Sequence, residues 1–133
     1  MIWRAAHALI GTRFRLHGRD PATGLDCVGL AAAALQAAGL NPGPVPTGYG
    51  LSDHDHDAIH TMMQTAGLVR TALPLRTGHI ALYLVGHRQH HLAIIGLQSA
   101  VHAHAGLRRV VESPLPLDGQ YLASFVPDFQ KDN

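Results

Sequence analysis

Cys27 is the only cysteine of the 133-residue chain, and its position suits a nucleophile. A turn containing Gly24 precedes it, and a nearly uninterrupted apolar stretch with helical character follows it. The thiol therefore falls on the first turn of a predicted helix, where free backbone N–H groups and the helix dipole stabilise an anion. Such a position can lower a thiol pKa from about 8.5 into roughly the 3.5–7.5 range. A single thiol forms no internal disulfide, so Cys27 is either a buried packing residue or a reactive group.

A cysteine nucleophile needs a general base within hydrogen-bond reach, and the base needs an orienting partner. Histidine suits both roles because its pKa lies near neutrality, and the chain has 11 histidines. His91 opens an apolar strand pattern, and His102 lies on the next predicted strand. If these strands pair as a hairpin, both imidazoles can lie on one face of the sheet, beside the helix start. In this arrangement His91 accepts the thiol proton, and His102 fixes the tautomer of His91.

Helical patterns come first in the chain, and strand patterns follow them. Apolar spacing predicts helices over residues 2–10, 26–38 and 54–66, with a loop over residues 11–25. Apolar and β-branched runs bounded by turn residues predict six strands, over residues 69–73, 79–85, 91–97, 100–104, 109–112 and 121–126. This order is typical of an α+β domain with an antiparallel sheet of five or six strands. The helix that carries Cys27 is apolar on almost every side, so we expect it to be buried.

Length and composition favour a single globular domain over residues 1–133. Hydrophobic residues make up 47% and charged residues 14% of the chain, which is typical of a packed core rather than disorder. The formal net charge is +1, and no basic stripe indicates nucleic-acid binding. No apolar run reaches the ~20 residues of a membrane span. Residues 2–10 are too short and too polar for a signal peptide, so we expect synthesis in the cytoplasm without an export signal.

Three segments resemble the motifs of the NlpC/P60 family of papain-like cysteine peptidases. They are Asp26-Cys27-Val28-Gly29-Leu30, His91-Leu92-Ala93-Ile94, and Val101-His102-Ala103 followed by Gly106. Their order, on a predicted helix and two predicted strands, is that of the family's nucleophile, base and third polar residue. Two flanking segments are also similar, Gly11-Thr12-Arg13-Phe14-Arg15 and Gly78-His79-Ile80-Ala81, so the resemblance covers residues 5–126.

The resemblance implies an α+β, papain-like fold in which the nucleophile lies at the start of a buried helix. It also implies a thiol peptidase without a cofactor, in which Cys27 attacks an amide carbonyl, His91 protonates the leaving amine, and His102 is the third catalytic residue. The family's substrates are peptidoglycan stem peptides, commonly cleaved between D-glutamate and a diamino acid.

One subgroup of the family is the most similar to this chain, namely the cell-wall peptidases encoded beside tail genes of phages and gene transfer agents. The similarity lies in the short Gly18-Arg19-Asp20 loop and the segment 110–115. It implies phage-tail proteins as partners and a phage or gene-transfer-agent particle as a location.

Further residues near Cys27 could serve the same reaction. The oxyanion is expected at the backbone N–H of Cys27, and Asp26 either helps to shape that site or caps the helix. Arg13, Arg15 and Arg19 could bind substrate carboxylates in bidentate pairs. Alternatively, these three arginines belong to a solvated loop.

Three positions depart from the family pattern. Phe14 stands where many members have a tyrosine whose hydroxyl lies near the nucleophile, so that polar contact is missing. Val28 replaces the common serine after the nucleophile, and His79 replaces an aspartate with a structural role. None of these changes removes a member of the triad, so we expect an active enzyme.

Two other functions are compatible with the sequence. One is a metal-binding module, because residues 53–57 alternate Asp and His, and His56 and His60 have i,i+4 spacing. His102 and His104 form a second His-x-His pair, but we expect their rings to face opposite sides of the strand. Because residues 53–60 also lack a His-Glu-x-x-His pattern, no physiological metal is expected. The other function is a catalytically silent tail protein with the same fold.

Overall fold

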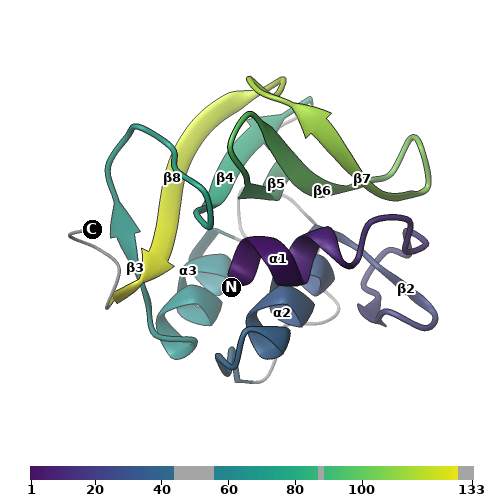
Figure 1. Ribbon diagram of the computed structural model, residues 1–133, viewed down its shortest axis with the longest axis horizontal. Helices are drawn as coiled ribbons and strands as arrows, with labels where there is room; N and C mark the ends of the chain where they lie inside the picture. Colours follow the sequence, from purple (N-terminus) through teal and green to yellow (C-terminus); the bar gives the residue numbers. More distant parts are fainter. Residues whose placement is uncertain (44–55, 87–88, 129–133) are drawn as a thin grey trace.

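The structure is a computed structural model, and it describes residues 1–43, 56–86 and 89–128. Its main sheet has six antiparallel strands in the order β3-β8-β4-β5-β6-β7, which confirms the α+β prediction (Figure 1). The strands are β3 (Leu68–Thr71), β4 (Ile80–Val85), β5 (Gln89–Ile95), β6 (Ser99–His104), β7 (Arg109–Pro114) and β8 (Gln120–Pro127). The predicted loop over residues 11–25 contains a small antiparallel pair as well, β1 (Arg19–Asp20) with β2 (Gly24–Leu25).

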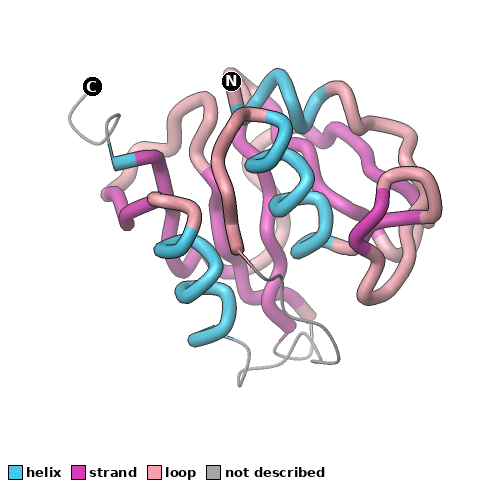
Figure 2. Tube along the Cα trace, turned by 90° about the horizontal axis from the view of Figure 1, so that it is seen from below, coloured by secondary structure: helices cyan, strands magenta, loops and turns pink. Residues whose placement is uncertain are grey.

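Helices α1 (Ile2–His7), α2 (Cys27–Ala37) and α3 (His56–Thr65) cover one face of this sheet (Figure 2). Side chains alternate along the strands, so that Leu82, Leu92 and Ile94 join the core under the helices. The neighbouring Tyr83, Ala93 and Ile95 join a smaller apolar cluster on the opposite face. No helix in the described part of the chain is long and apolar enough to cross a membrane.

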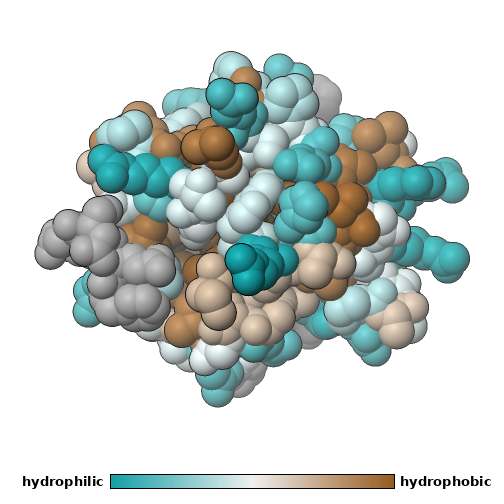
Figure 3. Space-filling model, viewed as in Figure 1, coloured by the Kyte–Doolittle hydropathy of each residue, from teal (hydrophilic) through white to brown (hydrophobic). Residues whose placement is uncertain are grey.

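Exposed apolar side chains are dispersed over the surface. On the face that Figure 3 shows, brown apolar groups alternate with polar ones. Among the described residues, the large exposed apolar side chains are those of Met1, Ile10, Leu16, Leu73, Leu97 and Leu107. Isolated exposures of this kind are normal for a folded domain.

Helix α2 is buried over most of its length, as its composition predicts. The Asp26 carboxylate caps it by accepting the backbone N–H of Gly29, and Gly39, at φ +86°, follows its C-terminal end. All residues from Cys27 to Ala32 are buried. Four consecutive alanines allow the sheet to approach closely, and α2 packs against both β5 and β6.

Strands β5 and β6 separate at the point where α2 begins. Ladder pairing between these two strands, both fully described, is confined to Ile94 with Val101 and Ile95 with Ala100. The first half of β5 and the second half of β6 therefore diverge, and the start of α2 packs against both strands. This divergence exposes side chains of both strands to the helix terminus.

The contact between Gly29 and Gly18 holds the loop before α2 against the helix. A Cβ on Gly29 would overlap the backbone carbonyl oxygen of Gly18, which no side-chain rotation can relieve. We expect Gly29→Ala to lower the free energy of unfolding by about 2–3 kcal/mol, as measured by urea denaturation. Gly39→Ala, at the other end of α2, is the control, because a Cβ there meets nothing within 4 Å. It costs only the left-handed conformation, about 1 kcal/mol, so an equal loss in the two variants would contradict the packing role of Gly29.

Candidate active site

Cys27, His91 and His102 line one cleft of about 540 Å³. Cys27 is the first residue of α2, His91 lies on β5, and His102 lies on β6. The sequence analysis selected these three residues, and the structure brings them together because β5 and β6 diverge around the helix start. The cleft leaves the thiol itself only 2% exposed.

The two histidines of the cleft are joined by a direct hydrogen bond. His91 Nε2 lies 2.8 Å from His102 Nδ1, and the rings meet edge to face with an interplanar angle of 79°. The other nitrogen of His102, Nε2, lies 2.8 Å from Ser113 Oγ on β7. Nε2 of His91 is thus held by His102, which is held in turn by Ser113. An imidazole held in this way can act as a general base with an orienting partner.

Burial, rather than the helix terminus, dominates the protonation state of Cys27. The pKa of the thiol is raised from 9.0 to about 12, chiefly by removal from water and to a smaller extent by the nearby Asp26 carboxylate. Backbone hydrogen bonds from Leu92 and Val28 and the Arg19 guanidinium act in the opposite direction but do not compensate. The predicted lowering of this pKa is therefore wrong for the unliganded protein, because desolvation outweighs the field of the helix start.

The imidazole of His91 is also held neutral. Its pKa is lowered from 6.5 to about 4, chiefly by burial and also by the nearby His102 and His104 rings. Burial lowers the pKa of His102 as well. The site therefore holds a neutral thiol and two neutral imidazoles.

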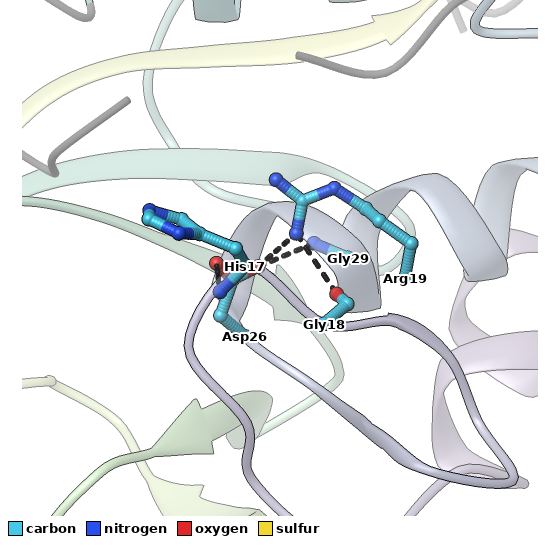
Figure 4. A network of polar contacts seen from close by, with 5 residues as sticks. All are labelled: His17, Gly18, Arg19, Asp26 and Gly29. Carbon is cyan, nitrogen blue, oxygen red and sulfur yellow. Dashed lines mark hydrogen bonds and ion pairs between the residues drawn. The ribbon is translucent and has the colours of Figure 1, made fainter. Parts of the chain in front are cut away.

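Asp26 is fully buried, and its carboxylate organises the approach to the nucleophile (Figure 4). It accepts the backbone N–H of Gly29 at 2.8 Å and that of His17 at 2.9 Å. Arg19 donates Nη1 to the same carboxylate at 2.8 Å and to the carbonyl of Gly18 at 2.8 Å. Of the two roles considered for Asp26, the structure shows the helix cap. The carboxylate is directed toward the loop rather than into the cleft, because the cleft lining does not include it.

The three arginines predicted to bind substrate do not line the cleft as described. Arg19 is paired with Asp26, and its side chain is 20% exposed. Arg13 and Arg15 are exposed on the segment beside β2, where Arg13 forms an isolated bridge with Arg109. Phe14 does line the cleft together with Cys27. An apolar ring therefore lies where many members of the similar family have a tyrosine.

His102 and His104 share one face of β6, with ring centroids 5.7 Å apart. The expectation that they face opposite sides is wrong, because residues two apart on a strand point the same way. Even so, no group of three or more His, Cys, Asp or Glu side chains that could hold a metal occurs among the residues described. Residues 53–55 and the side chain of His56 lie outside the described residues, while the His60 ring packs edge-on against Phe125 at 5.0 Å.

Sequence reasoning missed one wall of the cleft. Ser113 lies beyond the predicted end of its strand, which continues to Pro114. Extending the second of the two predicted strands by one residue would have placed Ser113 opposite Ala100, beside His102. The other lining residues that the sequence analysis did not assign to the site are Val85, Gln89, His90, His104, Ala105, Pro114, Pro116, Leu117 and Asp118. The loop that carries Pro116 and Leu117 offered no periodicity from which to predict its position.

Two solved structures have a similar fold. The first is described as similar to a lipoprotein of the NLP/P60 family from Staphylococcus aureus, with a TM-score of 0.63 and 15% identity. The match covers 94% of this chain and 39% of that one, so the present chain spans well under half of that protein. The second is the NlpC/p60 domain of the peptidoglycan hydrolase SagA, with a TM-score of 0.62, 21% identity, and coverage of 92% and 93%. No family model and no curated protein matches the sequence. The fold is therefore that of NlpC/P60 domains.

The neutral His91 makes folding stability depend on pH. Its pKa is about 4 in the folded protein and 6.5 when unperturbed, so the unfolded chain binds more protons between these values. The contribution of His91 to the free energy of unfolding is fully present above about pH 6.5. It is lost as the pH falls towards 4, and the loss is about 3 kcal/mol at most. We expect His91→Gln to lose less free energy of unfolding between pH 7 and pH 4.5 than the unchanged protein, as measured by urea denaturation at both pH values. The exposed His7→Gln is expected to lose as much as the unchanged protein, and equal losses in His91→Gln and the unchanged protein would contradict the assignment.

Proposed function

We propose that the chain is an NlpC/P60-type cysteine peptidase that hydrolyses amide bonds in peptidoglycan stem peptides. The observation that carries the proposal is the single cleft in which Cys27, His91 and His102 meet, on the fold of NlpC/P60 domains. A peptidoglycan hydrolase domain with the same fold supports the choice of substrate.

The geometry supports acyl transfer with His91 as the base. Nδ1 of His91 takes the Cys27 proton as the sulfur attacks the carbonyl, and the same proton then goes to the leaving amine. The developing oxyanion is stabilised by the Cys27 backbone N–H at the start of α2. His102, through its bond to Nε2, stabilises the imidazolium that forms. Water then attacks the thioester and releases the acyl group.

On this proposal, the neutral thiol of Cys27 and the neutral imidazole of His91 become reactive only when a substrate enters the cleft. The thiol is raised to a pKa of about 12 chiefly by desolvation, so a polarised carbonyl and the oxyanion must replace the missing water. Because the imidazole is neutral, it can accept the proton at any pH above about 4. Proton transfer coupled to attack is therefore the step that this geometry favours over a preformed thiolate.

The bond that we propose is cleaved lies between D-glutamate and a diamino acid. The family resemblance suggests this bond, and one feature of the cleft supports it. Asp118 is the only carboxylate of its described lining, which includes no arginine or lysine, so this wall suits the amino group of a diamino acid.

The finer assignment to phage or gene-transfer-agent tails is also part of the proposal. It rests on the similarity of residues 18–20 and 110–115 to that subgroup. It carries with it tail proteins as partners and delivery in a particle after synthesis in the cytoplasm.

A catalytically silent protein of the same fold is the second candidate. The observation in its favour is the burial of the thiol, at 2% exposure, beside a base that is itself neutral. Activity and thiol accessibility separate the two candidates.

The activity prediction uses purified stem peptides containing a D-glutamyl–diamino acid bond, with products identified by mass spectrometry. We expect cleavage by the unchanged protein and a loss of at least about a thousandfold in Cys27→Ser, because a serine hydroxyl is a far weaker nucleophile in this site. Ala33→Ser, on the same helix but outside the cleft lining, is the control and should retain activity. Cleavage at an unchanged rate by Cys27→Ser would end the peptidase proposal.

The thiol prediction uses iodoacetamide on the native protein. With the pKa of Cys27 raised to about 12, the thiolate fraction and the alkylation rate should rise about tenfold per pH unit between about pH 7 and 10. A rate already level at pH 7 would instead show the lowered pKa expected from the sequence. Alkylation that occurs only in denaturant would favour the silent protein.

A further inference from the structure

We propose that Ser113 is a positioning residue, which favours the tautomer of His102 that allows His91 to act as the base. This inference deepens the proposed function and rests on it. Ser113 acts through His102, because its hydroxyl bonds the nitrogen of His102 that is far from His91.

The register of two strands places the serine at this nitrogen. In the β6–β7 ladder His102 is paired with Val111, and Ala100 with Ser113. Ser113 is two residues from Val111, so its side chain emerges on the same face of β7. That face is also the one on which His102 and His104 lie. The result is a continuous chain of contacts, from His91 Nε2 to His102 Nδ1 at 2.8 Å and from His102 Nε2 to Ser113 Oγ at 2.8 Å.

The direction of each hydrogen bond follows from the task of His91. To accept the thiol proton at Nδ1, a neutral His91 must carry its own proton on Nε2. This Nε2–H then donates to His102, whose Nδ1 must be bare. His102 must therefore carry its proton on Nε2, and that N–H needs an acceptor, which Ser113 Oγ supplies.

The opposite tautomer of His102 would disable the base. If His102 carried its proton on Nδ1, it would donate to His91 Nε2, and His91 would then carry its proton on Nδ1. That nitrogen could not accept a proton from Cys27. The hydroxyl of Ser113 can also rotate and donate to a bare Nε2, so the serine does not exclude this tautomer. It favours the competent one because it gives the Nε2–H an acceptor, and an enclosed N–H without an acceptor is costly.

The surroundings make Ser113 the partner on which the tautomer depends. Burial keeps both His91 and His102 neutral, so each ring has one proton to place. The nearest other ring is that of His104, whose Nδ1 accepts the backbone N–H of Leu107 at 3.0 Å. Without the serine, His102 Nε2 would lose its recorded partner, and the Nδ1–H tautomer, which turns its proton to His91, would gain population.

The test compares Ser113→Ala with Ser113→Thr and with Ser99→Ala. Threonine keeps the hydroxyl. Ser99 lies on β6 and donates its hydroxyl to Glu112 at 2.6 Å, so Ser99→Ala removes a serine hydroxyl that bridges the same two strands outside the cleft. Two-bond 1H–15N correlation spectra report which nitrogen of His102 is protonated, and iodoacetamide alkylation at pH 7 reports base assistance to Cys27. Neither measurement requires a substrate, so the result is independent of whether the chain cleaves peptidoglycan peptides.

We expect Ser113→Ala to slow alkylation about tenfold, and its His102 spectrum to shift from the Nε2–H towards the Nδ1–H form. Ser113→Thr should restore both values, and Ser99→Ala should change neither. If the stem-peptide assay succeeds, kcat should fall in Ser113→Ala with KM unchanged. An unchanged His102 tautomer in a folded Ser113→Ala protein would overturn the inference, as would equal slowing in Ser99→Ala. Failure of peptide cleavage with the expected tautomer shift would count against the substrate alone.

Discussion

The buried carboxylate of Asp26 is the constraint on which the candidate site depends. A carboxylate without water costs several kcal/mol unless it is paired, and Asp26 is paired with two backbone N–H groups and the Arg19 guanidinium. These partners lie on both sides of it, on the loop at residues 17–19 and on the first turn of α2. The need to pair the Asp26 carboxylate therefore holds the loop against the start of α2. It also sets the direction of the next residue, Cys27. The close contact of Gly18 with Gly29 is possible only because Gly29 carries no side chain.

The sheet provides the other half of the site through a local failure of pairing. Strands β5 and β6 are joined at Ile94 and Ile95 and then diverge, so α2 reaches both strands. The Leu92 N–H is not paired along that ladder and bonds the thiol instead. His91 and His102 meet diagonally across the same opening. A fully paired hairpin would have closed the space that the thiol occupies.

The same enclosure sets the chemical character of the site. Burial raises the pKa of the Cys27 thiol and lowers that of the His91 imidazole. Both groups are therefore neutral, and they do not form a thiolate–imidazolium ion pair in advance. In the proposed reaction, low solvation would also strengthen every hydrogen bond to the charge that develops. On that proposal the site is unreactive until a substrate enters it. It also depends on the placement of single protons, because neutral histidines act through their tautomers.

Much of the fold could be predicted from local patterns. The capped apolar segment at Cys27 and the strand patterns on both sides of His91 and His102 are local properties of the chain, and they were sufficient for the α+β class. The selection of His91 and His102 as partners of Cys27 also needed the resemblance of the three motifs to those of a known family. Local patterns failed where the answer depends on neighbours distant in sequence. The lowered pKa expected for Cys27 considered the helix start but not the sheet that buries it. The role of Arg19 was also obscured, because its partner Asp26 is reached only through the turn between them. Ser113 was out of reach since its place beside His102 is a matter of register. The sequence by itself determined which residues are candidates for chemistry and which elements hold them, because periodicity and capping act over a few residues. Only the tertiary structure decided how far β5 and β6 separate, which groups lose their water and which nitrogen meets which oxygen, because these depend on packing between segments far apart in the chain.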